Sequence, residues 1–344
     1  MYSRYFTRFC RERNIKQHTI NGYRSAINQY MSFCGIPIDE LINEAINEED
    51  NRVSLKNRKL KSRLIDFRSF LLDSNLSQTT SKIYFAHIKT LYRHFEVEIP
   101  YLPSVKYDVG YETNYFDIPT KDHIAQALDV VHIDLKAVIL FMSSSGTAKA
   151  ETLSLTVGDF INATMEYHDG GSLDDVLNLL ASRDDVVPTF YLRRIKTGKY
   201  YYTFCSPEAS FYIVKYLKTR KNIELGDKLF DFTNSLLVSR FQEINDYMGW
   251  GLKGNYRFFR THTLRKFHAS NIGLSVEYID ALQGRGKNEV HERYVKTNPD
   301  KLKQVYMSAM KNVMICPSKE KKIESQEFTI VINVFLSGKE YNLY

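Results

Sequence analysis

The sequence predicts a mainly helical protein of two domains, with a small β-sheet in the second domain. In residues 1–105, apolar side chains recur at intervals of three and four residues, the spacing of amphipathic helices. Further along, two aromatic-rich runs flank Thr197-Gly198, a pattern typical of a β-hairpin. A chain of 344 residues is long enough for two domains. Residues 106–118 read as a linker, 119–315 as the second domain, and 316–344 as a tail whose FTIVINVFL run alternates as a strand would.

Composition limits the classes of protein without choosing one. Lys and Arg number 47 against 40 Asp and Glu, a net charge of +7. This excess is compatible with nucleic acid, although many unrelated proteins share it. No apolar run is long enough for a bilayer, and the polar YSRYFTRFCRERN after Met1 predicts no signal peptide. The cysteines lie far apart without metal-ligand spacing, so we expect reduced thiols and a cytoplasmic protein: Cys10, Cys34, Cys205 and Cys316.

Four helices are predicted in the first domain, forming a small bundle. The first starts with Thr19 as its cap and stops at Gly35, and the second covers IDELINEAI. A third spans roughly residues 54–73, and a fourth opens near Ser77. The third helix carries five closely spaced cations, which in an isolated helix indicate a solvated face: Lys56, Arg58, Lys59, Lys61 and Arg63.

The second domain begins with Thr120 as a helix cap and continues with an apolar helix, a Gly turn and a helix that contains Glu151. We expect Glu151 to hold neighbouring backbone or a cation. Residues 161–186 read as a polar insertion with one short helix, and residues 207–250 as two helices. The expected core residues of these two helices are Phe211, Val214, Tyr216, Leu217, Leu236, Phe241 and Ile244.

The stretch from His262 to Tyr294 organises the second domain. His262 and Arg265 are three residues apart and share a helix face. A second helix follows, capped by Ser275, with Val276, Ile279 and Leu282 inward and a stop near Gly284. Arg285 follows at once, Tyr294 comes nine residues later, and Asn298-Pro299 starts an amphipathic helix that reaches Val313. That helix either packs on its own domain or docks on a neighbouring protomer.

This order of residues resembles the tyrosine recombinases, whose C-terminal signature is His-x-x-Arg, then Gly-His or Gly-Arg, then a tyrosine. HTLR, QGR and HERY supply the three parts, and VHERYVKTNPDKLKQVY is most similar to archaeal integrases of viral or plasmid elements. The helical first domain resembles the family's core-binding domain, so its five cations are expected to neutralise DNA phosphates. Arg257 and Arg260, in the run YRFFR, either contact DNA or anchor the loop that enters HTLR.

The resemblance implies a catalytic role for each matching residue. Tyr294 would attack the scissile phosphorus and hold the DNA as a phosphotyrosine, which conserves the bond energy without a metal or another cofactor. Arg265, Arg285 and His262 would stabilise the charge that develops on the non-bridging oxygens. On the predicted hairpin, Lys196 would protonate the leaving 5′ hydroxyl, with Lys199 as the second choice.

The first catalytic box departs from the family's usual Gly-Leu-Arg-Ile-Ser-Glu. Aligning Gly146 and Glu151 puts Ala148 at the position of the first arginine, with Lys149 beside it. One residue along a helix is a rotation of about 100°, so Lys149 need not point at the same phosphate. Three explanations stay open: Lys149 replaces the arginine through a local shift, the chain is a variant substituted to slow catalysis, or it is a naturally impaired recombinase.

The function implied by the resemblance is site-specific cutting and rejoining of double-stranded DNA. A homodimer would bind inverted half-sites, a homotetramer would form the synaptic complex, and the protein would be cytoplasmic and nucleoid-associated. Two alternatives belong to other classes. Ala148 is compatible with a DNA-binding protein without turnover, and a type IB topoisomerase would share the same chemistry.

Overall fold

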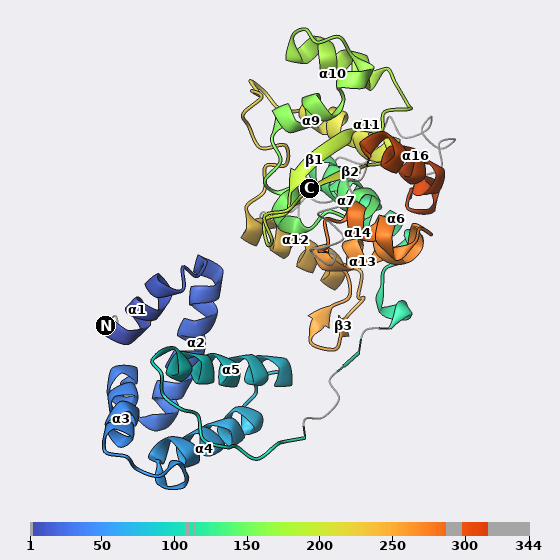
Figure 1. Cartoon of the computed structure of the whole chain (residues 1–344). Helices are drawn as coiled ribbons and strands as arrows, with labels where there is room; N and C mark the ends of the chain where they lie inside the picture. The colour runs from blue at the N-terminus through green and yellow to red at the C-terminus, as the bar shows by residue number, and fades with distance from the viewer. Residues whose placement is uncertain (1–2, 107–110, 113, 287–297, 316–344) are drawn as a thin grey trace, which may run out of the picture. The chain divides into compact units, whose positions relative to one another are not determined.

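The computed structural model describes residues 3–106, 111–112, 114–286 and 298–315, in two compact units, Met1–Glu112 and Thr113–Tyr344 (Figure 1). In the described residues the strands form two small antiparallel sheets, and helices make up most of the rest. The predicted mainly helical class with a small β component is therefore confirmed. Every described helix is too short or too polar to cross a lipid bilayer.

The first unit is a bundle of five described α-helices, one more than predicted. Its elements are α1 (Arg4–Glu12), α2 (Gln17–Cys34), α3 (Ile38–Asp50), η1 (Leu55–Asn57), α4 (Lys59–Asp73) and α5 (Gln78–His94). The unpredicted helix, α1, is capped by the Ser3 hydroxyl and buries Phe6 and Phe9. Its many charged residues hid this short apolar pattern.

The boundaries in this unit match the sequence signals where a cap or a glycine decides them. Gly35 ends α2 in the left-handed conformation, and the Ser77 hydroxyl accepts a hydrogen bond from the Thr80 N–H at the start of α5. The predicted start at Thr19 is wrong, because α2 already begins at Gln17. The predicted 54–73 helix is broken, because Arg58 is extended and separates η1 from α4.

Thr120 caps α6, the first α-helix of the second unit, as predicted. The second unit contains more elements than the first. They are η2 (Tyr115–Asp117), α6 (Lys121–Asp129), α7 (Ile133–Ser145), α8 (Lys149–Thr152), α9 (Val157–Ala163), η3 (Met165–Tyr167), α10 (Leu173–Ala181), β1 (Thr189–Arg193), β2 (Tyr200–Phe204), α11 (Pro207–Leu217), α12 (Asn234–Tyr247), β3 (Leu252–Lys253), β4 (Tyr256–Arg257), α13 (Thr261–Asn271), α14 (Val276–Leu282), α16 (Pro299–Ala309) and η4 (Met310–Asn312).

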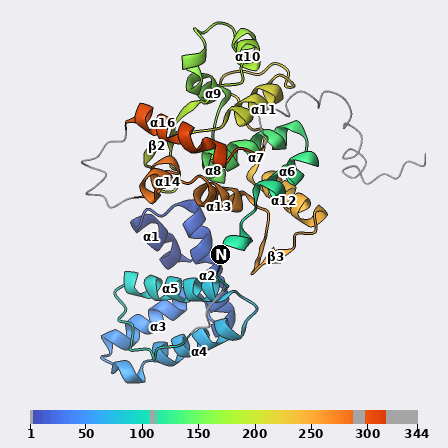
Figure 2. The same ribbon diagram turned by 90° about the vertical axis from the view of Figure 1, so that its right-hand side faces the viewer.

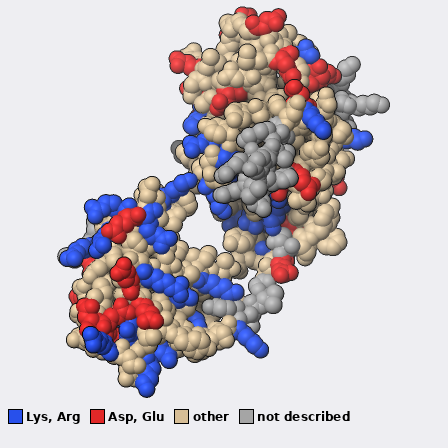
Figure 3. Space-filling view, in the orientation of Figure 1, with Lys and Arg blue, Asp and Glu red and all other residues tan. Residues whose placement is uncertain are grey.

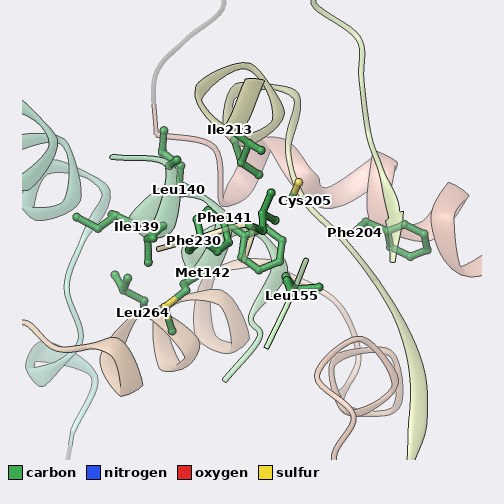
Figure 4. Close-up of a cluster of buried hydrophobic side chains, with 14 of the residues drawn as sticks. Ile139, Leu140, Phe141, Met142, Leu155, Phe204, Cys205, Ile213, Phe230 and Leu264 are labelled. Carbon is green, nitrogen blue, oxygen red and sulfur yellow. The ribbon is translucent and has the colours of Figure 1, made fainter. Parts of the chain in front are cut away.

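Helix α7 lies at the centre of the second unit. It is buried on all sides from Ala137 to Ser145, as expected of a helix without a polar face, and α11 and α13 pack against it. Figure 4 shows side chains from several elements meeting around Phe141, including Phe230 and Ile213. The central helix ends at Gly146, which therefore has a fixed position inside the unit.

The hairpin predicted around Thr197-Gly198 is present as the antiparallel pair β1–β2. Thr189 lies opposite Phe204, and Arg193 lies opposite Tyr200. Alternation along β1 buries Phe190 and Leu192 and exposes Tyr191 and Arg193. The turn that joins the strands is therefore held at a fixed place beside the core.

Three predicted helix faces were tested by the structure. Leu236 and Val276, expected in the core, are exposed, and Leu237 takes the buried position of α12. Helix α16 packs on its own unit beside β2 (Figure 2), with the Tyr306 hydroxyl donating to the Ser144 carbonyl at 3.0 Å. The FTIVINVFL run of the tail lies outside the described residues.

Candidate functional site

Arg265 connects three segments that are far apart in the sequence. It lies on α13, its residue is only 5% exposed, and both ends of its guanidinium donate to backbone carbonyls. Nη1 donates to the Gly146 carbonyl at 2.6 Å, and Nη2 donates to the Gln283 carbonyl at 2.7 Å. The segments that contain Gly146, Arg265 and Gln283 thus meet at one side chain.

The contact between these segments requires glycine at position 146. Gly146 has a φ of +66°, and a Cβ added there would lie 2.6 Å from His268 Nδ1 and 2.7 Å from Gln283 Nε2. Those two side chains are themselves paired, because Gln283 Nε2 donates to the Arg265 carbonyl at 3.1 Å and lies 2.9 Å from His268 Nδ1. His268 is fully buried and contacts Gln283, so its role is to pack the interior of this unit.

Positive charge accumulates around Arg265. Burial lowers its pKa to about 10, and the charges of Arg194 and Arg285 act in the same direction, whereas Tyr201 and Glu151 oppose them. A buried cation held by neutral carbonyls keeps its full charge in a medium that screens it poorly. Such a centre favours an incoming anion.

A pocket of about 540 Å³ opens beside this centre and is lined by Ala148, Lys149, His262 and Arg265. His262 keeps an exposed edge, yet partial desolvation and the nearby cations, Arg260 first among them, lower its pKa. It is therefore neutral near pH 7, with one ring N–H available as a donor. Lys149 is half-buried at the start of α8, and desolvation lowers the pKa of its ammonium group.

The Gly-Arg box lies against the hairpin. Gly284 has a φ of +59°, and a Cβ there would approach the Tyr201 ring to 2.5 Å. The Lys199 ammonium group is 3.4 Å from the Arg285 carbonyl, and the exposed Arg285 side chain is 3.7 Å from Asp280. Lys196 is exposed in the hairpin turn. Tyr294 lies outside the described residues.

Sequence reasoning missed Arg194. Glu151 Oε1 accepts a hydrogen bond from the Ile195 N–H at 2.9 Å and lies 3.0 Å from Arg194 Nη1, so Glu151 holds both backbone and a cation, as expected. A signal for Arg194 existed, because the alternation that buries Leu192 points residue 194 to the same side.

Two further cations predicted to bind DNA lie near the pocket. Arg257 is held by Asp246, with Nη2 2.8 Å from Oδ2, whereas Arg260 stacks over the Tyr256 ring at 4.3 Å. Burial lowers the pKa of Arg260. Figure 3 shows Lys and Arg gathered at the lower end of this unit, over α12 and α13, and acidic side chains mostly toward α10.

In the first unit, three of the five cations predicted to bind DNA are paired with carboxylates of α3. Lys59 and Arg63 both lie 2.6 Å from Glu44, and Arg58 pairs with Glu49. These pairs attach α4 and its leading turn to α3. Lys56 is exposed, and Lys61 is half-buried.

In the described part of the chain, no group of three or more His, Cys, Asp or Glu side chains could hold a metal ion. The polar groups that do converge are guanidinium, ammonium and imidazole, which suit a phosphate.

No protein-family model and no curated protein matches the sequence. Among solved structures, the chain is similar to a lambda integrase tetramer bound to a Holliday junction, at 15% identity and a TM-score of 0.51, over 85% of this chain and 75% of that one. A lambda integrase (75–356) dimer bound to a COC′ core site gives 15% identity and the same TM-score, over 84% and 93%. The chain therefore has the fold of the tyrosine recombinases, as the resemblance of its motifs implied.

Proposed function

We propose that this protein is a site-specific DNA recombinase that cuts and rejoins DNA through a 3′-phosphotyrosine, without metal or ATP. The observation that carries the proposal is the junction at Arg265. This buried guanidinium ties the Gly146 and Gln283 segments together, and no carboxylate of the described residues pairs with either of its Nη atoms. The similar lambda integrase structures are bound to a Holliday junction or a core site, which supports DNA as the substrate class.

In the proposed mechanism the Tyr294 hydroxyl gives its proton to water and its oxygen bonds to the scissile phosphorus, while the bond from phosphorus to the 5′ oxygen breaks. Arg265 and Arg285 bind the non-bridging oxygens, and neutral His262 donates a hydrogen bond to the same phosphate. Lys196 protonates the leaving oxygen from the hairpin, and Lys199 holds the hairpin near the Arg285 backbone. Rejoining reverses these steps, with the 5′ hydroxyl attacking the phosphotyrosine.

Lys149 contributes a further positive charge to the phosphate pocket in this proposal. Its half-buried ammonium group lines the same pocket as His262 and Arg265. DNA contacts outside the site come from Lys56, Lys61, Arg257 and Arg260, with the paired cations Arg58, Lys59 and Arg63 shaping the surface. A homodimer on inverted half-sites and a homotetramer at synapsis complete the assembly.

The test begins with target sites recovered by selection from a random DNA pool. A nicked substrate built on such a site traps the cleaved strand, because the fragment after the cut diffuses away. We expect a covalent protein–DNA adduct with the parent protein and none with Tyr294→Phe. An adduct of equal yield in Tyr294→Phe would contradict the assignment of the nucleophile.

A second function is favoured by one observation: Ala148, at the usual arginine position, lines the pocket. If the chain is a DNA-binding protein without turnover, the selected sites will bind tightly and yield no adduct. A third outcome, relaxation of supercoiled DNA without sequence preference, would indicate a type IB topoisomerase.

A further inference from the structure

The partners of Glu151 bear on what replaces the arginine that is missing at position 148. Ala148 is the N-cap of α8, and Glu151 lies three residues later, in the same short helix. The side chains of an N-cap residue and of the residue three positions later can contact each other, so an arginine at 148 would have been within reach of this carboxylate. In this chain, Glu151 takes its cation from the hairpin, with Arg194 Nη1 3.0 Å away.

Arg194 is not a surface arginine that happens to lie nearby. Its side chain is 16% exposed and the residue at Glu151 is 3% exposed, so the pair is nearly removed from water. Its neighbour Arg193 behaves differently, because it stacks over Tyr200 on the outer face and donates from Nε to the Gly198 carbonyl. The hairpin thus directs one arginine outward and the next one inward.

The buried cluster around Arg194 carries more positive than negative charge. Arg265 is buried and Arg194 is half-buried; Glu151 pairs with Arg194, and the charges of both Glu151 and Arg194 act on Arg265. Among the described residues, Glu151 Oε2 and the Tyr201 hydroxyl are buried without a hydrogen-bond partner, so the cluster is not closed on itself. Excess positive charge in a poorly screened site is what a phosphate in the transition state requires.

We propose that Arg194, held in place by Glu151, supplies the phosphate-binding guanidinium that position 148 lacks. The proposal rests on the proposed function and deepens it, because it assigns a further catalytic residue to the same site. The hairpin would then deliver two cations to one phosphate: the Arg194 guanidinium to a non-bridging oxygen and the Lys196 ammonium group to the leaving oxygen.

The experiment is a double-mutant cycle between positions 194 and 148, read as the single-turnover rate of adduct formation on preformed complexes. Arg194→Ala should slow the rate about 100- to 1000-fold, as the loss of one transition-state donor does. Arg193→Ala, the matched control, should stay within about threefold of the parent, because that side chain faces outward. Adding Ala148→Arg to Arg194→Ala should restore the rate at least about tenfold.

Two results would overturn the assignment. One is an Arg194→Ala rate within about threefold of the parent while Lys149→Ala loses the rate instead. The other is an equal gain from Ala148→Arg in the parent and in Arg194→Ala, because independent sites give additive effects. If Arg194→Ala fails to fold, Arg194→Lys keeps the charge beside Glu151 but not the fork, and it should still be at least about tenfold slower.

A binding readout keeps this test separate from the proposed function. If the parent forms no adduct, the recombinase proposal fails, and the role of Arg194 is then read from DNA affinity. Neutral methylphosphonate groups are placed at successive positions of the selected site in the Tyr294→Phe background. At one position the neutral group should weaken DNA binding by Tyr294→Phe. The same group should weaken binding by the double variant Tyr294→Phe, Arg194→Ala at least about threefold less. Equal losses at every position would rule out a phosphate contact by Arg194.

Discussion

Arg63 in the first unit and Arg265 in the second are both largely buried on helices, but their partners differ. Arg63 pairs with the Glu44 carboxylate, and although burial lowers its pKa, the hydrogen bond to Glu44 raises it above the ordinary value. Arg265 is held by the carbonyls of Gly146 and Gln283, and its pKa falls to about 10. Arg63 is held by a carboxylate, whereas the described hydrogen-bond partners of Arg265 are neutral carbonyls.

The difference decides how much of a cation's charge is left for a ligand. A guanidinium that already faces a carboxylate, as Arg63 faces Glu44 and Arg194 faces Glu151, must share that ion pair with an incoming phosphate. A guanidinium held by carbonyl dipoles is positioned but keeps its net charge. Counting basic residues along a helix cannot make this distinction, since both kinds read as Arg in the sequence.

The sharpest way to break the comparison is to remove each arginine. Arg265→Ala should lower the adduct-forming rate by about 1000-fold or more, because both a transition-state contact and the junction of three segments are lost. It should also lower the free energy of unfolding by about 2–4 kcal/mol, since two buried carbonyls lose their donors. Rates come from single-turnover assays, and stability comes from urea denaturation.

Arg63→Ala is the control for that experiment. It removes a buried partner of Glu44 and should destabilise the first unit, yet leave the rate of adduct formation on saturating DNA within about threefold. A rate loss as large as that of Arg265→Ala would mean that Arg63 acts on the reaction itself and is not only a structural partner of Glu44.

Next in size is the effect of the glycine at the junction. Gly146 and Gly35 have nearly the same φ, +66° and +67°, but a Cβ at 146 would meet the His268 ring, whereas one at 35 has no atom within 4 Å. Gly146→Ala should cost about 3 kcal/mol of stability through backbone strain and overpacking, and Gly35→Ala about 1 kcal/mol through strain alone. Equal losses by urea denaturation would show that the junction is not closely packed.

The pH dependence of stability offers a smaller, separate test of the junction. Complete burial lowers the pKa of His268 to about 3, so the folded state prefers the neutral ring while the unfolded state takes up a proton below about pH 6.5. The stabilisation is thus complete above pH 6.5 and is lost as the pH falls toward 3, at up to about 1.4 kcal/mol per pH unit. Denaturation at pH 7.5 and at pH 5.5 gives the free energy of unfolding lost between the two values. This loss should be smaller in His268→Gln than in the parent. It should be the same as in the parent in the control His18→Gln, which changes an exposed residue.

The sequence predicted the parts of the fold that local chemistry decides. Gly35, Ser77 and Thr120 mark helix boundaries because left-handed turns and hydroxyl caps need particular residues. The inward-facing predictions at Leu236 and Val276 failed, because two apolar residues in succession leave the register of a helix face open until its neighbour is known. Tertiary packing, not local pattern, chose Leu237.

The sequence motifs identified four residues that line the pocket, but they did not reveal the ion pair between Glu151 and Arg194, which are distant in the sequence. His262, Arg265, Lys149 and Ala148 do line one pocket. Arg194 was overlooked because its partner, Glu151, is 43 positions earlier, and nothing in the local sequence states that the hairpin returns to α8. Arg58, Lys59 and Arg63 were expected to face DNA for the same reason: Glu44 and Glu49 belong to another helix.

The smallest expected effect compares two lysines, Lys56 in η1 and Lys59 at the start of α4. Lys56 is exposed, whereas Lys59 is exposed but shares Glu44 with Arg63. If the carboxylate already neutralises Lys59, Lys56→Ala should lower the slope of log affinity against log salt by about 0.9, and Lys59→Ala should change it by clearly less. Fluorescence anisotropy on a selected site between 50 and 200 mM salt gives both slopes. A Lys59 effect equal to that of Lys56 would mean that DNA competes successfully for a cation that Glu44 already pairs in the free protein.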